Sequence, residues 1–220
     1  MAHEDLLASS DFFAAAAPDV LRTITASGHE RTLIRGDVLF QEGDPADDLY
    51  VVIRGRLAMA IENPIDHRET VVSLMEPGDL FGEMPMLDDG PRSTMARALE
   101  PSTVMAIPYD AVLAMFRAQP ELLWGVTRLL ANRLRAMDET LADSVFLDVT
   151  GRTAKRLLEL SDGADEFTLP VTQEELAGMV GASRERVNKA IASFIRLGWI
   201  DQHERRYTIL KRPSLEIRAR

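Results

Sequence analysis

ELLWGVTRLLANRLRAMDETLADSVF, residues 121–146, is the stretch around which this 220-residue chain is organised. Five of its apolar residues are spaced by seven, four, three and four positions, which is the a/d pattern of a helix that pairs with a second helix. They are Leu123, Leu130, Leu134, Met137 and Leu141. At ~1.5 Å per residue the helix is roughly 40 Å long, more than a small core requires. We therefore expect a dimerisation helix. The alternative is an amphipathic helix that covers one side of a core.

The composition is that of a globular protein, with 46% hydrophobic and 27% charged residues. No apolar run approaches the ~20 residues that a membrane span needs, and the N-terminus MAHEDLLASSDFF is acidic where a signal peptide is basic. We therefore expect a cytoplasmic protein with no membrane partner. Cysteine is absent, which excludes a disulfide scaffold, a cysteine nucleophile and a thiolate-bound cluster. The four histidines show no metal-ligand spacing, so no metal site is predicted.

Charge is divided unevenly along the chain. Residues 1–147 carry 12 Arg, no Lys and 24 acidic residues, whereas residues 148–220 carry 13 basic and 11 acidic residues. Residues 184–220 alone carry 10 basic and 4 acidic residues. An acidic front half followed by a basic C-terminal end indicates a polyanion-binding module that is joined to a domain of another kind.

The front half has the pattern of a compact antiparallel β domain. Short helices are expected within residues 1–30, where Pro18 suits a first helical turn. Beyond residue 31, β-branched and aromatic segments alternate with Gly-Asp and Gly-Arg turns about every ten residues. The expected strands span residues 38–42, 49–53, 56–61, 69–75 and 103–108. This spacing favours a barrel, roll or sandwich over an α/β sheet.

The chemistry of the front half is concentrated in DLFGEMPMLDDGPRSTM, residues 79–95, where a strand is expected to end at residue 81. Gly82 at the start of a helical turn would let backbone N–H groups approach an anion. Arg92 can direct two donors to a phosphate, Ser93 adds a hydroxyl, and Glu83 can accept from a sugar hydroxyl. There are two alternatives: Glu83 only favours a helix N-terminus, or Arg92 pairs with a carboxylate at residue 88 or 89.

The back half contains a helix-turn-helix pattern in TQEELAGMVGASRERVNKAIASFIRLGWI, residues 172–200. Thr172 and Glu175 form a capping box that opens one helix. Gly181 permits a tight turn, and Ser183 caps the second helix. Apolar residues are spaced so that the two helices pack; the alternative is a generic α-hairpin. After residue 198 the chain reads WIDQHERRYTIL, which predicts two short strands that form a wing.

The second helix has the residue types that read DNA bases in the major groove. Arg184 can donate to both acceptors of a guanine, Glu185 can accept from cytosine, and Lys189 can reach a guanine or a phosphate. Asn188 lies on the same face. The candidate phosphate contacts are Arg205 and Arg206 in the wing, with Thr153, Lys155, Thr172 and Ser183 as further candidates. The alternative is that these are solvated charges at a helix start.

Four of these segments resemble the CRP/FNR family of regulators, and most closely its cyclic-AMP receptor branch. They are RGDVLFQEGDPADDLYVVIRGRL (35–57), FGEMPMLDDGPRS (81–93), FLDVTGR (146–152) and GASRERVNKA (181–190). The cysteine cluster of the redox-sensing branch is absent. The resemblance implies a cyclic-nucleotide pocket in which Arg92 and Ser93 bind the cyclic phosphate. In that pocket Glu83 binds the ribose 2′-hydroxyl, Gly82 allows close approach of the backbone, and Met84 is a further ligand-binding residue.

The base end of that implied pocket departs from the family pattern. The family has a Thr/Ser pair on the long helix, and counting back from Phe146 places Met137 and Asp138 there. Met137 offers apolar contact, and Asp138 can accept from an exocyclic amine. Cyclic AMP is the expected allosteric ligand, with no covalent cofactor. A different ligand, or none, is the alternative.

The sequence thus predicts an α+β protein that is not an enzyme. An N-terminal antiparallel β-roll (double-stranded β-helix or jelly-roll) forms a sensor over residues 1–119, a long dimerisation helix and hinge follow over 120–147, and a winged helix-turn-helix spans 148–220. The resemblance implies a homodimer that binds a palindromic TGTGA-like operator on double-stranded DNA. It also implies contact with RNA polymerase, with the loop 161–166 as one candidate surface. A cyclic-nucleotide-binding interaction module without a DNA role is a further alternative.

Overall fold

The computed structural model describes residues 3–64 and 69–220. The chain divides into two compact units: residues 1–61 with 72–135, and residues 62–71 with 136–220. Among the helices of the described ranges, none has both the length and the apolar character that a bilayer span requires.

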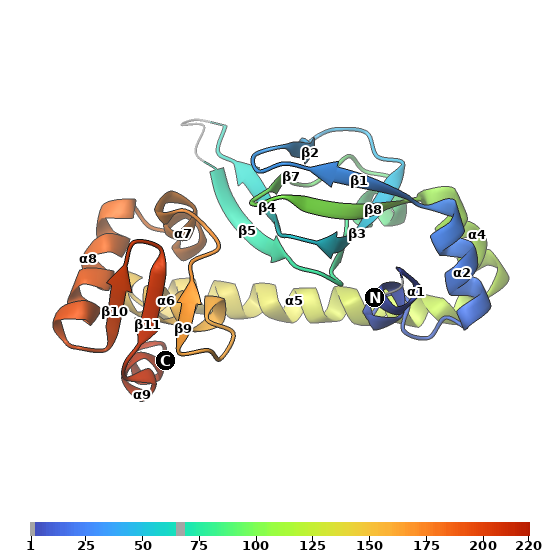
Figure 1. The fold of residues 1–220 in the computed structure, drawn as a ribbon. Helices are drawn as coiled ribbons and strands as arrows, with labels where there is room; N and C mark the ends of the chain where they lie inside the picture. Colours follow the sequence, from blue (N-terminus) through green and yellow to red (C-terminus); the bar gives the residue numbers. More distant parts are fainter. Residues whose placement is uncertain (1–2, 65–68) are drawn as a thin grey trace. The chain divides into compact units, whose positions relative to one another are not determined.

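The first unit is built on two four-stranded sheets whose described pairings are antiparallel (Figure 1). One has the order β1-β8-β3-β6, formed by His29–Leu33, Ser102–Pro108, Asp48–Arg54 and Leu80–Phe81. The other has the order β2-β7-β4-β5, formed by Val38–Phe40, Met95–Ala98, Leu57–Glu62 and Glu69–Met75. Buried side chains of both sheets share one core, in which Phe40, Tyr50 and Phe81 pack ring against ring. The predicted β-roll is confirmed.

The five expected strands correspond to β2, β3, β4, β5 and β8, whereas β1 and β7 are strands that the sequence pattern does not predict. β1 buries Leu33 alone and exposes its other four residues, so it lacks the alternation of a half-buried strand. β7 reads MARA, and alanine has little intrinsic preference for strands. Both are formed by pairing with segments distant in sequence, since β1 pairs with β8, and β7 pairs with β2 and β4.

Helices pack on the other side of the first sheet, where residues of β3 and β8 share a second core with them. These are α1 (His3–Ser9), α2 (Pro18–Ser27), α4 (Tyr109–Ala118), a 3-10 turn (Pro120–Leu122) and the start of α5. Pro18 stands at the start of α2, as predicted. Gly125 of α5 lets the N-terminal segment pass closely, because a Cβ there would lie 2.6 Å from the carbonyl oxygen of Phe12. A short helix, α3 (Met84–Asp88), follows β6.

The long helix α5 spans Leu123–Phe146 and contributes to both units. Its buried residues are Gly125 and Val126. The predicted seam residues are exposed to solvent: Leu123 by 43%, Leu130 by 40%, Leu134 by 60%, Met137 by 68% and Leu141 by 63%. The apolar row therefore does not cover a core of its own chain, which is what the amphipathic alternative requires.

The second unit contains three packed helices and a three-stranded sheet (Figure 1). The helices are α6 (Val149–Leu160), α7 (Gln173–Val180) and α8 (Arg184–Arg196), and they bury Leu157, Leu176, Val187 and Phe194. The sheet has the order β10-β11-β9, formed by Ile200–His203, Arg206–Ile209 and Glu166–Thr168. β10 and β11 are the two strands of the predicted wing. A last helix, α9 (Arg212–Arg218), packs on α6.

Candidate functional site

The turn between β6 and α3 holds Gly82 in a backbone conformation that other residues rarely adopt. Its φ is 77°, and a Cβ at this position would lie 2.6 Å from Nη1 of Arg92. The Gly82 carbonyl accepts hydrogen bonds from Arg92 Nη1 at 2.8 Å and from the Tyr109 hydroxyl. Both the turn and the close approach of the guanidinium therefore require glycine here.

Arg92 points into the protein and is only 4% exposed. Its Nη1 also donates to the Tyr109 hydroxyl at 3.1 Å, and its Nη2 donates to the Asp48 carbonyl at 2.7 Å. The guanidinium carbon lies 4.2 Å from the ring centre of Phe40 and 5.3 Å from that of Tyr50, within the range of cation–π attraction. The groups that contact this cation are thus backbone carbonyls, a phenol and aromatic rings, all of which are neutral.

The expected alternative, in which Arg92 pairs with a carboxylate at residue 88 or 89, is wrong. Asp88 instead accepts from the backbone N–H of Gly90 at 3.0 Å. Asp89 ends α3 in the left-handed conformation, with φ 56°. Within the described residues, no carboxylate forms an ion pair with Arg92.

Glu83 is fully buried, and its Oε1 forms an ion pair with Nη1 of Arg133, whose side chain is 33% exposed. Arg133 also donates through Nη2 to the Leu80 carbonyl at 2.6 Å. Glu83 makes no side-chain capping bond to α3, so the alternative that it only opens this helix is not supported. The pair links the β6–α3 turn to α5 within the first unit.

Two buried polar atoms in this region have no partner in the described part of the chain: Oε2 of Glu83 and Nε of Arg92. Buried polar atoms are nearly always hydrogen-bonded, so each such atom calls for an explanation. An unpaired carboxylate oxygen can accept from a hydroxyl, and an unpaired guanidinium N–H can donate to an anion. The two residues therefore fit a ligand that carries both groups, as a cyclic nucleotide does.

The helix-turn-helix is fixed by its predicted caps. Thr172 Oγ1 accepts from the Glu175 N–H at 3.1 Å, and the Glu175 carboxylate accepts from the Thr172 N–H at 2.6 Å. Gly181 ends α7 with φ 67°. Ser183 Oγ accepts from the Arg186 N–H at 3.4 Å and caps α8. These local bonds satisfy helix-end N–H groups and set where α8 begins.

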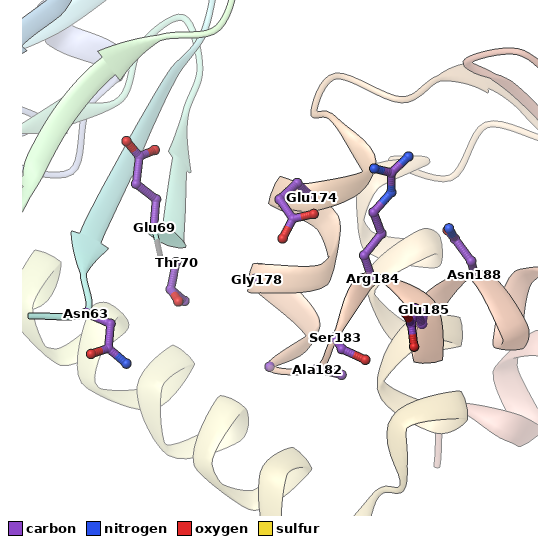
Figure 2. A pocket seen from close by; sticks show the side chains of 11 residues that line it. Asn63, Glu69, Thr70, Glu174, Gly178, Ala182, Ser183, Arg184, Glu185 and Asn188 are labelled. Carbon is purple, nitrogen blue, oxygen red and sulfur yellow. The ribbon is translucent and has the colours of Figure 1, made fainter. Parts of the chain in front are cut away.

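The start of α8 presents polar side chains on the side opposite its buried face. Arg184, Glu185, Asn188 and Lys189 are all exposed, and none forms a side-chain hydrogen bond within the described ranges. Figure 2 shows Arg184 and Asn188 extending from the same side of α8. Side chains placed in this way at a helix start are available to base edges.

Two family models match most of the chain. The cyclic nucleotide-binding domain matches residues 30–119, and the Crp-like helix-turn-helix domain matches residues 151–218. The CRP-like cAMP-activated global transcriptional regulator of Mycobacterium tuberculosis is 37% identical over 224 residues, which cover 99% of this chain and 100% of that protein. The chain belongs to the CRP/FNR family of transcription regulators.

Solved structures in this family share the fold. FixK2 from Bradyrhizobium japonicum has a TM-score of 0.77 at 20% identity, over 86% of this chain and 96% of that chain. The c-di-GMP responsive global regulator CLP of Xanthomonas campestris has a TM-score of 0.76 at 25% identity, over 88% and 99%. The predicted family membership and the classification as a regulator rather than an enzyme are confirmed.

The remaining ligand residues predicted for this CRP/FNR regulator lie at the surface. Ser93 is exposed, and its hydroxyl donates to the Met84 sulfur at 3.7 Å. Met137 and Asp138 are exposed on α5, about one helical turn after Arg133. Their role in recognising a base stays a prediction.

The two wing arginines of this CRP/FNR regulator differ in position. Arg205 lies in the turn and is exposed, but its Nη2 donates back to the Leu169 carbonyl at 2.8 Å. Arg206 is the exposed first residue of β11. Their contacts with phosphates stay predictions.

One of the further phosphate candidates is corrected by the structure. Thr153 is fully buried, and its hydroxyl donates to the Val149 carbonyl at 2.7 Å, so it cannot reach DNA. Lys155 forms a 2.5 Å ion pair with Asp143, and its contact with a phosphate stays a prediction. The sequence shows only that these residues are polar, because the helix face on which they lie depends on what packs against α6.

Sequence reasoning missed three residues near these sites. Arg133 lies 50 positions from Glu83, and Tyr109 lies 17 positions from Arg92, so no local spacing connects them. Arg186 is exposed in the first turn of α8. The sequence could have identified Arg186, because it is a second arginine at the predicted start of this helix.

Proposed function

We propose that this chain acts as a homodimer that binds a palindromic operator in the cytoplasm and is switched by a cyclic nucleotide. The proposal rests on four exposed side chains at the start of α8, which three caps hold in place: Arg184, Glu185, Asn188 and Lys189. None of them forms a side-chain hydrogen bond with another described residue. By analogy with the family, the operator half-site is TGTGA-like, with Arg184, Glu185 and Lys189 as its readers. Two such helices in a dimer would meet successive major grooves ~34 Å apart.

The proposed ligand is cyclic AMP. Arg92 would direct its buried Nε–H to the phosphate, and Glu83 would accept a hydrogen bond from a ribose hydroxyl through Oε2. Neither atom has a partner among the residues that the structure describes. The Mycobacterium tuberculosis relative is named as a cAMP-activated regulator, which supports this choice.

A guanine-containing nucleotide is a second candidate ligand. Asp138 on α5 stands where the family pattern has a hydroxyl, and a carboxylate accepts from an amine but cannot donate to a ring nitrogen. The Xanthomonas campestris neighbour is named as responsive to c-di-GMP, which supports testing a guanine-containing nucleotide as well.

The proposed dimer interface is the exposed seam of α5. Its five apolar residues are 40–68% exposed in one chain, and a second copy would bury them in the a/d arrangement of a coiled coil. Since Glu83 is paired with Arg133 on the same helix, ligand binding at Glu83 would bias how the seam packs. This gives a route from ligand to DNA affinity.

RNA polymerase is the proposed further partner. The loop after α6 carries Asp162 and Gly163 in left-handed conformations, with φ 45° and 78°. Alanine substitutions at residues 162–163 that reduce transcription but not operator binding would support this contact.

The deciding experiment combines calorimetry with operator binding. The full chain is titrated with cyclic AMP, cyclic GMP and c-di-GMP, and each ligand is added to gel shifts with a TGTGA palindrome and a scrambled control at fixed salt. Heat of binding together with tighter palindrome binding for cyclic AMP is expected. Heat with no discrimination between the two DNAs would overturn the operator role and leave a ligand-binding module. Discrimination without heat would overturn the cyclic AMP assignment.

A further inference from the structure

Arg92 is an unusual cation because it is buried without a carboxylate partner among the described residues. Burying an unpaired charge is costly unless other groups replace the lost hydration. The nearby carboxylate of Glu83 is paired with Arg133 instead. Among the described residues, the arginine is therefore stabilised by carbonyl groups, aromatic rings and one phenol, and its positive charge remains available to an anion.

The phenol belongs to Tyr109, a buried residue at the first position of α4. Its hydroxyl donates to the Gly82 carbonyl and accepts from Arg92 Nη1 at 3.1 Å. Burial raises the pKa of this hydroxyl to about 12, so it is neutral and keeps its proton near neutral pH. Tyr109 thus joins the guanidinium to the glycine that shapes the turn.

Strand pairing fixes where this phenol stands. Asp48 begins β3 and is paired with Pro108 at the end of β8, and the Tyr109 N–H donates to the Asp47 carbonyl at 2.8 Å. The Asp48 carbonyl, which accepts from Arg92 Nη2, and the Tyr109 hydroxyl therefore come from adjacent, paired chain segments. They engage both terminal nitrogens of the guanidinium, whereas Nε has no partner in the part of the chain that the structure describes.

We propose that Tyr109 is a positioning residue that holds Arg92 so that its Nε edge faces the anionic group of the ligand. This inference rests on the proposed cyclic-nucleotide site and adds to it a residue that contacts the arginine rather than the ligand. Without the hydroxyl, Arg92 keeps its hydrogen bonds to the Gly82 and Asp48 carbonyls but loses its bond to Tyr109. The Gly82 carbonyl also loses the hydrogen bond that Tyr109 donates. The affinity for the anionic part of the ligand should then fall, while the affinity for the uncharged part should not.

The test compares the wild-type full chain with Tyr109→Phe by calorimetry, using cyclic AMP and adenosine as probes. We expect about tenfold weaker binding of cyclic AMP in Tyr109→Phe, the scale of one hydrogen bond to a charged group. Adenosine affinity should change less than twofold. Tyr207→Phe is the matched control, since it removes a buried tyrosine hydroxyl from the second unit, and it should leave both affinities unchanged. A merely structural role would weaken both probes alike.

The outcomes separate this inference from the proposed function. If the wild type binds cyclic AMP and Tyr109→Phe binds it equally well, the role of Tyr109 is overturned and the ligand assignment stands. If the wild type does not bind cyclic AMP, the ligand assignment fails. The role of Tyr109 is then tested with inorganic phosphate as the anion. Thermal unfolding at constant ionic strength should show a smaller rise in Tm with phosphate for Tyr109→Phe than for wild type. Equal shifts, including none in either protein, would overturn the inference.

Discussion

The Glu83 carboxylate is paired through one oxygen with Arg133 on α5, while its other oxygen is buried and has no partner in the described chain. The two residues differ in exposure, since Glu83 is fully buried and the Arg133 side chain is 33% exposed. One bond thus connects the predicted ligand turn with the predicted dimer helix. Because of this difference in burial, the loss of stability should depend on which of the two partners is removed.

Arg133→Met should destabilise the protein more than Glu83→Gln does. The first change leaves a fully buried carboxylate without its cation, which costs about 3–5 kcal/mol. The second leaves an arginine that is partly solvated, so its cost should be smaller. Urea unfolding of both variants measures the difference, and equal losses would mean that the buried charge is relieved by another route. In ligand binding the order should reverse, because the remaining oxygen of Glu83→Gln would face Arg133 and an NH2 donor would replace the proposed acceptor oxygen.

Gly82→Ala should weaken cyclic AMP binding by tenfold or more, about 1.4 kcal/mol per tenfold. The added Cβ would lie 2.6 Å from Arg92 Nη1 and must displace the guanidinium. Gly36→Ala is the control, because Gly36 has φ 91° with nothing within 4 Å of an added Cβ. Both variants carry the left-handed strain of about 1–2 kcal/mol, so both should lose stability. Calorimetry that shows equal affinity losses would count against displacement of Arg92.

Leu134→Glu should convert the proposed dimer to a monomer of 24.5 kDa. Leu134 is 60% exposed in one chain, so the substitution costs little in the monomer but would place two charges in a dimer seam. Glu139→Lys is the control, since Glu139 is an exposed polar residue of the same helix outside the a/d row. Light scattering after gel filtration gives the masses. An unchanged dimer in Leu134→Glu would move the interface elsewhere.

Arg184→Ala should reduce sequence discrimination by about 1–3 kcal/mol, the range of a bidentate contact with a guanine. Arg196→Ala removes the same charge from the far end of α8, where Arg196 is exposed and donates to Ser193. It should lower affinity for all DNA sequences to a small and similar extent. Gel shifts with the palindrome and a scrambled duplex at one salt concentration compare the two. Equal discrimination in both variants would exclude Arg184 as a base reader.

Acid should weaken the second unit partly through Asp148, the N-cap of α6. The bond from the Gly151 N–H and the contact with Arg218 hold the pKa of this carboxyl below its ordinary value of 3.8. Because the pKa is lower in the folded than in the unfolded state, the ionised carboxylate stabilises the folded state at pH values above the unfolded pKa. This stabilisation is lost as the pH falls below about 4. The side chain is 64% exposed, so we expect an effect of a few tenths of a kcal/mol. Urea unfolding at pH 6 and pH 3.5 should show a smaller loss in Asp148→Asn, which keeps a capping oxygen but does not titrate.

The parts of this protein that could be predicted from sequence are those that short-range chemistry decides. The capping box of Thr172 and Glu175, the left-handed Gly181 and the Ser183 cap all lie within a few residues of the atoms they serve. The helix-turn-helix could therefore be located to the residue. The a/d spacing of α5 is likewise a local pattern, although the spacing alone cannot distinguish a partner helix from a core.

Other features could not be predicted because they depend on contacts between distant segments. β1 and β7 have weak strand patterns and are strands only because their neighbours pair with them. Thr153 is polar in sequence and fully buried in the fold. The sequence indicated that Arg92 faces an anion, but it did not indicate that the arginine is buried between Phe40 and Tyr50 and held by Tyr109.

The sequence by itself thus determined the family, the order of the two domains and the residue types at each site, since turns, caps and periodicity are encoded within one or two helical turns. The tertiary structure alone decided that Glu83 is paired with Arg133. It also decided that both Nη nitrogens of Arg92 donate hydrogen bonds, while its Nε has no partner among the described residues. The reason is physical. A buried charge must take its partners from whatever the packed strands and helices bring to it, and those partners lie 10 to 50 positions away along the chain.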